Sequence, residues 1–148
     1  MPETPPYGAY AAIMATFAGG LAGAGLLARA LDRDPYQHTT LDLATLALAT
    51  FKAARTIARD PVASFIREPL VDDEPRNGMQ QALGELVTCT RCTGTWVAAG
   101  LGATQIVTPR FGRLLTWTLG AAGVNDFLQA GFAALAHKGN ELEHRAEG

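Results

Sequence analysis

Two cysteines two residues apart, Cys89 and Cys92, stand directly ahead of an uncharged run that carries a tryptophan. If both lie in the first turn of a helix, the positive end of the helix dipole favours their thiolate forms, and Arg91 adds further positive charge. Such a pair is able to exchange disulfides or to supply two zinc ligands. The alternative is that both are small residues where a helix enters a membrane, with thiols kept reduced in the cytoplasm.

A complete redox or metal site would need more than these two thiols. Glu85 lies four residues before Cys89, where one helix would place it as a base or a further ligand. We favour the alternative that Glu85 pairs with a cation such as Arg91 or Arg59. Two thiols form only half of a structural zinc site, so zinc would require further ligands, and the other soft ligands are the histidines His38, His137 and His144. A thioredoxin-like enzyme would also need a βαβ unit, and no strand pattern is visible. The sequence therefore requires no cofactor.

A cluster of polar residues interrupts the apolar segment 114–136. Asp126 lies near its middle, where a charged carboxylate inside a membrane costs about 2.5–3.5 kcal/mol, so we expect it to be protonated, paired or turned toward a polar cavity. Lys52 is its expected partner and Arg55 the second choice, and the cluster is completed by Asn125 and Gln129. We interpret the pair as an ion pair that fixes helix register rather than as part of a proton or ion pathway, because one acid makes no pathway.

Four helices are expected to position these residues, over about 7–28, 41–59, 83–108 and 114–137. The first contains no charged residue and would span about 33 Å, close to the thickness of a bilayer. Its small residues recur every fourth position, which lets another helix approach closely, at Ala15, Gly19 and Gly23. The alternative for this segment is a buried helix of a soluble bundle.

The second segment, 41–59, is amphipathic and either spans a membrane or lies flat in its interface. The residues after it, 60–82, hold many prolines and charges and predict an irregular cytoplasmic loop. At the junction, Arg59 and Asp60 are expected to form a cap and a contact with phospholipid or with the loop.

Composition excludes several classes of function. A chain of 148 residues fits one domain, and its net charge of −2 provides no basic surface for nucleic acid. Two cysteines exclude a disulfide-dense scaffold. Positive residues are fewer in the loops after the first and third helices than on the other side. The positive-inside rule therefore places both termini and the central loop in the cytoplasm.

Four stretches, LATFKAARTIARD, REPL, QALGELVTCTRCTGTW and LGAAGVNDFLQAGF, closely resemble in order and spacing the bacterial domain of unknown function family numbered 1360. The resemblance covers roughly residues 41–135. It implies a small integral membrane protein, and it carries no established activity or catalytic residues. In this family a proline often follows the first cysteine, and this chain has Thr90 there, which weakens a redox interpretation.

These observations together predict an all-α bundle in the bacterial inner membrane, most simply with four transmembrane helices. Its expected role is that of a non-enzymatic accessory or assembly subunit that contacts the lipid bilayer and packs against other membrane proteins or itself. The alternative function is a thiol redox or metal-binding membrane protein that uses Cys89 and Cys92. A soluble helical bundle is a third option.

Overall fold

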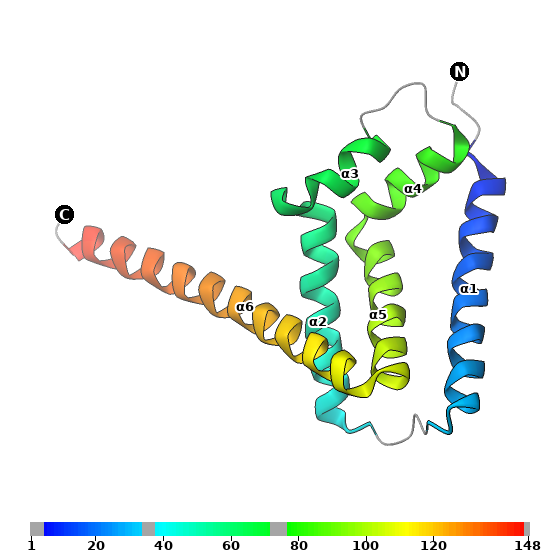
Figure 1. The fold of residues 1–148 in the computed structure, drawn as a ribbon. Coiled ribbons are helices and arrows are strands. Elements are labelled where there is room, and N and C mark those ends of the chain that lie inside the picture. Colours follow the sequence, from blue (N-terminus) through cyan, green and yellow to red (C-terminus); the bar gives the residue numbers. More distant parts are fainter. Residues whose placement is uncertain (1–4, 34–37, 72–76, 147–148) are drawn as a thin grey trace.

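The computed structural model describes residues 5–33, 38–71 and 77–146 and, within the last range, every side chain except those of residues 143, 144 and 146. The elements follow in the order α1 (Tyr7–Ala30), α2 (Thr40–Arg59), the short 3-10 helix η2 (Pro61–Ala63), α3 (Ser64–Val71), α4 (Gly78–Thr88), α5 (Thr90–Val107) and α6 (Pro109–Ala146) (Figure 1). No strand occurs in this described part of the chain. The all-α prediction is therefore confirmed.

Helices α2, α5 and α6 form the packed centre of the molecule. Figure 1 shows α2 and α5 side by side, with the first turns of α6 crossing them at the end away from α3 and α4. On the other side, α1 runs along α5 and reaches α4. The rest of α6 extends away from the other helices (Figure 1). Two long helices thus contact the bundle along only part of their surface.

Capping boxes fix where α2 and α4 begin. The Thr39 hydroxyl accepts the N–H of Asp42 at 3.2 Å, and the Asp42 carboxylate accepts the N–H of Thr39 at 2.9 Å. The same reciprocal pair joins Asn77 and Gln80, at 2.8 Å and 3.1 Å. Each box binds backbone N–H groups that the first helical turn leaves open.

The expected irregular loop over 60–82 is wrong for its described part, which is mostly helical. Pro61 takes the first position of η2, where its missing N–H loses no hydrogen bond, and α3 continues directly from η2. Asn77 then starts α4 inside the same segment. Residues 72–76, which carry the acidic part of the expected loop, lie outside the described residues.

The expected helix over 83–108 is divided into α4 and α5. Cys89 separates them with an extended backbone, at φ −91° and ψ 106°. Two side-chain contacts hold this break. The Cys89 thiol accepts the N–H of Cys92, and the Thr93 hydroxyl donates to the carbonyl of Leu86 at 2.8 Å. One continuous helix is excluded because both contacts require the chain to turn at Cys89.

The expected helix over 114–137 is longer at both ends, because α6 begins at Pro109 and ends at Ala146. Only Thr108 separates α5 from α6. A side chain at Gly112 would place its Cβ 2.5 Å from the Thr104 carbonyl, so glycine there lets the first turn of α6 fold back against α5. The segment directly after α5 is therefore the start of α6.

The buried residues of the described chain are small. Among fully buried side chains the largest is that of Thr116. The other buried residues are alanines, threonines, glycines and one leucine: Ala28, Ala49, Ala54, Ala58, Ala63, Ala82, Thr45, Thr93, Gly84, Gly112, Gly120, Gly123 and Leu101. Large apolar side chains instead point outward, with Phe132 and Leu135 each 74% exposed. This is the reverse of a water-soluble core, which buries leucine, isoleucine and phenylalanine.

By length and composition, α1 is the one helix among the described residues that is suited to cross a membrane, and only 6% of its most apolar part is buried. Helix α2 carries Lys52, Arg55 and Arg59, and α6 carries Asp126 within its apolar part. The all-helical fold is thus established, whereas the number of membrane spans stays a prediction.

The crossing of α2 and α6 depends on Gly123. A Cβ added there would lie 2.8 Å from the Leu48 carbonyl oxygen, whereas a Cβ at Gly131 of the same helix would meet nothing. We expect Gly123→Ala to destabilise the protein by about 1–3 kcal/mol, because the two helices must separate. Gly131→Ala should stabilise it by up to about 1 kcal/mol through helix propensity. Denaturant unfolding in detergent micelles, followed by circular dichroism, measures both, and equal effects would contradict this packing.

Candidate functional site

The clearest polar site of the bundle joins α2 and α6. Lys52 Nζ donates to both carboxylate oxygens of Asp126, at 3.1 Å to Oδ1 and 2.8 Å to Oδ2. The two side chains are 24% and 33% exposed, so the pair is partly shielded from solvent. Gly123 precedes Asp126 by nearly one turn, and a Cβ built on it would lie 3.5 Å from Lys52 Cβ. The ion pair therefore forms where the two helices come closest.

An aromatic contact lies beside this ion pair. Phe51 and Phe127, the neighbours of Lys52 and Asp126 in the chain, stack with ring centroids 5.1 Å apart and an interplanar angle of 27°. Stacked aromatic pairs contribute roughly 0.5–1.5 kcal/mol beyond their buried area. The ion pair and the stacked rings together hold one register between α2 and α6.

The rest of the expected polar cluster does not join this pair. Asn125 and Gln129 are exposed on α6, and neither makes a hydrogen bond to another described residue. Arg55 is also exposed and lies in a separate cavity along α2. The structure thus brings together one acid and one base. Such a pair suits a role in fixing the register of two helices rather than a role in proton transfer.

The two cysteines lie at the break between α4 and α5. Cys89 is the N-cap of α5, and its Sγ accepts the N–H of Cys92 at 3.3 Å. Both thiols are free, with Cys89 half-buried and Cys92 exposed. Hydrogen bonds from the Cys92 thiol and backbone lower the pKa of Cys89, and Arg91 adds a smaller effect in the same direction. Because the neighbouring Cys89 raises the pKa of Cys92, Cys89 is the thiol of the pair that ionises more readily.

No third metal ligand accompanies the thiols in the described part of the chain. Glu85 lies on α4, where it accepts a hydrogen bond from the Tyr10 hydroxyl and one from Gln81 at 3.4 Å. It forms no ion pair with Arg91 or Arg59, contrary to expectation, because the break at Cys89 turns α4 away from the axis of α5. His38 lines a cavity at another place, and the side chain of His144 lies outside the described residues. The described residues do not fit a zinc site.

The end of α2 is held by a residue that the sequence analysis missed. Arg67 Nη1 donates to the carbonyls of Ile57 at 2.6 Å and of Asp60 at 3.0 Å. Asp60 is the C-cap of α2, and its carboxylate accepts the Thr56 hydroxyl at 2.9 Å. Cations that follow a helix end often bind its last carbonyls, which is the signal that identifies Arg67. The exposed Arg59 takes no part in this cap.

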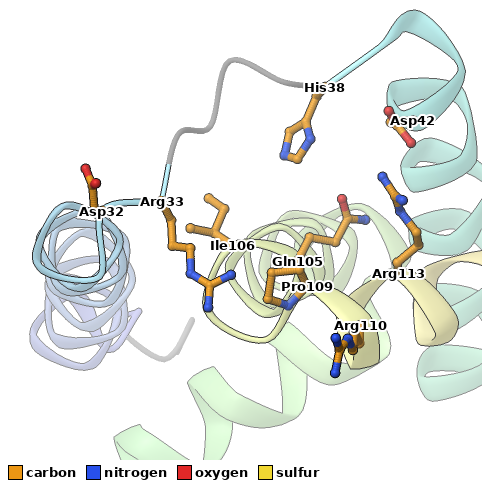
Figure 2. A pocket seen from close by; sticks show the side chains of 9 residues that line it. All are labelled: Asp32, Arg33, His38, Asp42, Gln105, Ile106, Pro109, Arg110 and Arg113. Carbon is orange, nitrogen blue, oxygen red and sulfur yellow. The ribbon is translucent and has the colours of Figure 1, made fainter.

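Sequence reasoning did not find the cavities beside the bundle, two of which are lined by charged residues from more than one helix. The first, which we call the Arg33 cavity, has a volume of about 450 Å³ and lies between the end of α1 and the junction of α5 with α6 (Figure 2). Its charged lining mixes both signs: Asp32, Arg33, His38, Asp42, Arg110 and Arg113. Figure 2 shows Arg113 extending toward Asp42, whose carboxylate already binds Thr39. Three arginines there lie beside two aspartates, so the cavity presents both signs of charge, and no ligand is assigned.

The second cavity, the Arg55 cavity, has a volume of about 440 Å³ and lies along α2 beside the start of α5. Its charged lining residues are all arginines: Arg55, Arg59 and Arg91. It therefore differs from the Arg33 cavity in carrying a single sign of charge among the described residues.

The ion pair yields a direct test. We expect Lys52→Met to destabilise the protein by about 1–3 kcal/mol, because Asp126 loses its partner in a partly shielded site. The added substitution Asp126→Leu should restore part of this loss, giving a coupling energy of about 1–2 kcal/mol in a double-mutant cycle. The exposed pair of Lys138 and Glu141 on the same chain is the control, with an expected coupling below about 1 kcal/mol. Equal coupling at the two pairs would contradict the register role.

Comparison with known proteins places this arrangement in a family. Sporulation protein YjcA of Bacillus subtilis (strain 168) is 26% identical over 104 residues, which cover 60% of this chain and 88% of that protein. No solved structure matches the chain. The family model DUF1360, described as a protein of unknown function, matches residues 45–132, a range that includes the ion pair, the cysteines and the Arg55 cavity. Since this range is more than half of the chain, the protein belongs to the DUF1360 family of unknown function, as its sequence resemblance implied.

Proposed function

We propose that the protein is a small integral membrane protein of the bacterial inner membrane. We further propose that it acts as a non-enzymatic accessory or assembly subunit, which packs against other membrane proteins or a second copy of itself through one face of α1. The observation that carries this proposal is the outward-facing surface of small residues on α1. This helix is 24 residues long, and almost none of its apolar part is buried.

The composition of the packed interior supports a membrane location. Lipid tails are as apolar as leucine, so helices in a membrane gain little by burying large apolar side chains and instead associate through small residues. The described residues follow this pattern, with alanine and threonine buried and phenylalanine and leucine outside. In water the same exposed surface would be an aggregation liability.

One side of α1 packs on the bundle. Phe17 meets Trp96 of α5 edge to face, with ring centroids 5.0 Å apart, and Tyr10 donates to Glu85 of α4. Ala28 is the buried residue of the helix. These three positions share one face, because their spacings of seven and eleven residues correspond to nearly whole turns.

The opposite side of α1 is open. Gly19 lies about 200° around the helix axis from Phe17, and Ala15 and Gly23 lie within about 40° of Gly19. All three are exposed, and a Cβ added at either glycine would meet nothing within 4 Å. The small-residue face therefore points away from the other described helices, and a second helix could pack closely against it.

The proposed topology places the end with α3 and α4, and with it both termini, in the cytoplasm. It rests on the larger number of lysines and arginines in the segments that this topology assigns to the cytoplasmic face. On this proposal α2, α5 and the first part of α6 accompany α1 in the membrane, and the ion pair neutralises the charges that α2 and α6 would otherwise carry there.

A non-enzymatic role agrees with the remaining observations. The name of the Bacillus subtilis relative refers to sporulation and to no reaction. The cysteine pair has no third protein ligand in the described part of the chain, so we do not propose a metal-binding function for it.

Substitutions on α1 test the proposal. We expect Gly19→Leu with Gly23→Leu to dissociate the protein from its membrane complex, because two bulky side chains block close approach of another helix. The matched control is Gly20→Leu with Gly25→Leu. It adds the same side chains at equally open positions about 100° and 120° away from Gly19. The measurement is the mass of the detergent-extracted complex on native gels.

The wild type and the control pair should migrate as a complex larger than the monomer, and the Gly19 and Gly23 variant as the monomer. A wild type that is monomeric from the outset, or equal loss of the complex in both double variants, would overturn the assignment of this face.

A further inference from the structure

The Arg55 cavity has two chemically different halves. One half is apolar and is formed by Ala47, Phe51 and Ala54 of α2, with Gly94 of α5. The other half carries Arg55, Arg59 and Arg91. From position 47 to position 59 the cavity follows α2 for about 18 Å, or more than three turns. It is therefore an elongated groove with an apolar stretch that leads to a cationic end.

The cationic end is suited to an anion. All three arginines are exposed, and none forms an ion pair with another residue in the described part of the chain. Arg91 lies in the first turn of α5, so the positive end of that helix dipole faces the same region. Planar guanidinium groups bind phosphate oxygens with paired, charge-assisted hydrogen bonds.

A second observation concerns a buried polar atom beside the groove. Thr50 lines it, and its Oγ1 is buried without a hydrogen-bond partner among the described residues. Threonine hydroxyls in helices commonly bond to a carbonyl one turn back, as Thr45 does to Leu41 at 2.8 Å. A buried hydroxyl without a partner is unusual in a folded protein. Because Oγ1 itself is buried, a polar group of a ligand in the groove satisfies it only after the side chain rotates toward the groove.

We propose that the Arg55 cavity binds an anionic phospholipid. The phosphate lies between the three arginines, and one acyl chain lies along Ala47, Phe51 and Ala54, with the glycerol ester oxygens near Thr50. The apolar half selects a lipid over free phosphate, because inorganic phosphate would leave that half empty. This inference rests on the proposed membrane location, where anionic headgroups lie beside the cytoplasmic ends of helices.

The experiment titrates the purified full chain in nonionic detergent with three probes: dioleoylphosphatidylglycerol, dioleoylphosphatidylcholine and inorganic phosphate. A ligand that binds the folded state raises the unfolding temperature, so the shift against concentration gives an apparent dissociation constant. We expect phosphatidylglycerol to bind at least about tenfold more tightly than phosphatidylcholine, and phosphate to cause no shift.

Two variants and two controls locate the site. Replacing Arg55, Arg59 and Arg91 together by glutamine should weaken phosphatidylglycerol binding at least about tenfold. The same change at three arginines of the Arg33 cavity, Arg33, Arg110 and Arg113, should leave it unchanged. Ala47→Phe fills the apolar half from an exposed position and should also abolish the shift. Ala44→Phe adds the same ring to an exposed position of α2 outside the groove and should not.

Three results would overturn the proposal: equal affinity for the two lipids, equal weakening in both arginine triples, or normal binding by Ala47→Phe. A shift with inorganic phosphate as large as with phosphatidylglycerol would instead assign a free phosphate ligand and would also overturn it. Failure of the proposed function is distinguishable, because a protein that stays in solution without detergent contradicts the membrane location whatever lipid it binds.

Discussion

The close approach of α2 and α6 is the constraint on which the other features depend. At Gly120 and Gly123 a Cβ would lie 3.1 Å and 2.8 Å from carbonyl oxygens of α2, so the two backbones nearly touch. The same crossing holds the ion pair of Lys52 and Asp126 and the stacked rings beside it. Helix α6 starts directly after α5. The crossing of α6 with α2 therefore also fixes the position of α5 relative to α2. The remainder of α6 then has no packing partner among the described residues.

This mode of packing buries few large apolar side chains. The small buried apolar area determines whether the fold is more favourable in water or in lipid. In water, folding is driven mainly by the removal of apolar area, and a bundle that buries alanine and threonine removes little of it. In lipid the exposed phenylalanines and leucines need not be buried in the protein. Close backbone contact and an internal ion pair then become the main stabilising interactions. The small interior, the open face of α1 and the exposed length of α6 are therefore consequences of one arrangement.

Features encoded by local patterns were accessible from the sequence. The ends of α1 and α2 lie within two residues of the expected bounds, because an uncharged run marks the first and charges and caps mark the second. Lys52 was named as the partner of Asp126 because a carboxylate in an apolar run needs a cation at similar depth. Asn125 and Gln129 were grouped with it on helical spacing, and they face outward because α6 meets α2 along a narrow line.

Features that depend on tertiary contacts were not accessible. The break at Cys89 uses a thiol as a helix cap, which is outside the usual set of capping residues. The early start of α6 requires Gly112 to clear the backbone of α5, and Arg67 binds the end of α2 across ten residues. The Arg55 cavity joins residues of two helices that no short motif connects.

The central claim is that lipid surrounds the outward apolar side chains, and collision accessibility of spin labels measures this most directly. Labels at Leu21→Cys of α1 and Leu128→Cys of α6, in a chain whose native cysteines are replaced by serine, would be studied in phosphatidylglycerol-containing vesicles. The account predicts that both labels collide more with oxygen, which concentrates in lipid, than with a water-soluble nickel chelate. Greater accessibility to the nickel chelate at both positions would contradict it.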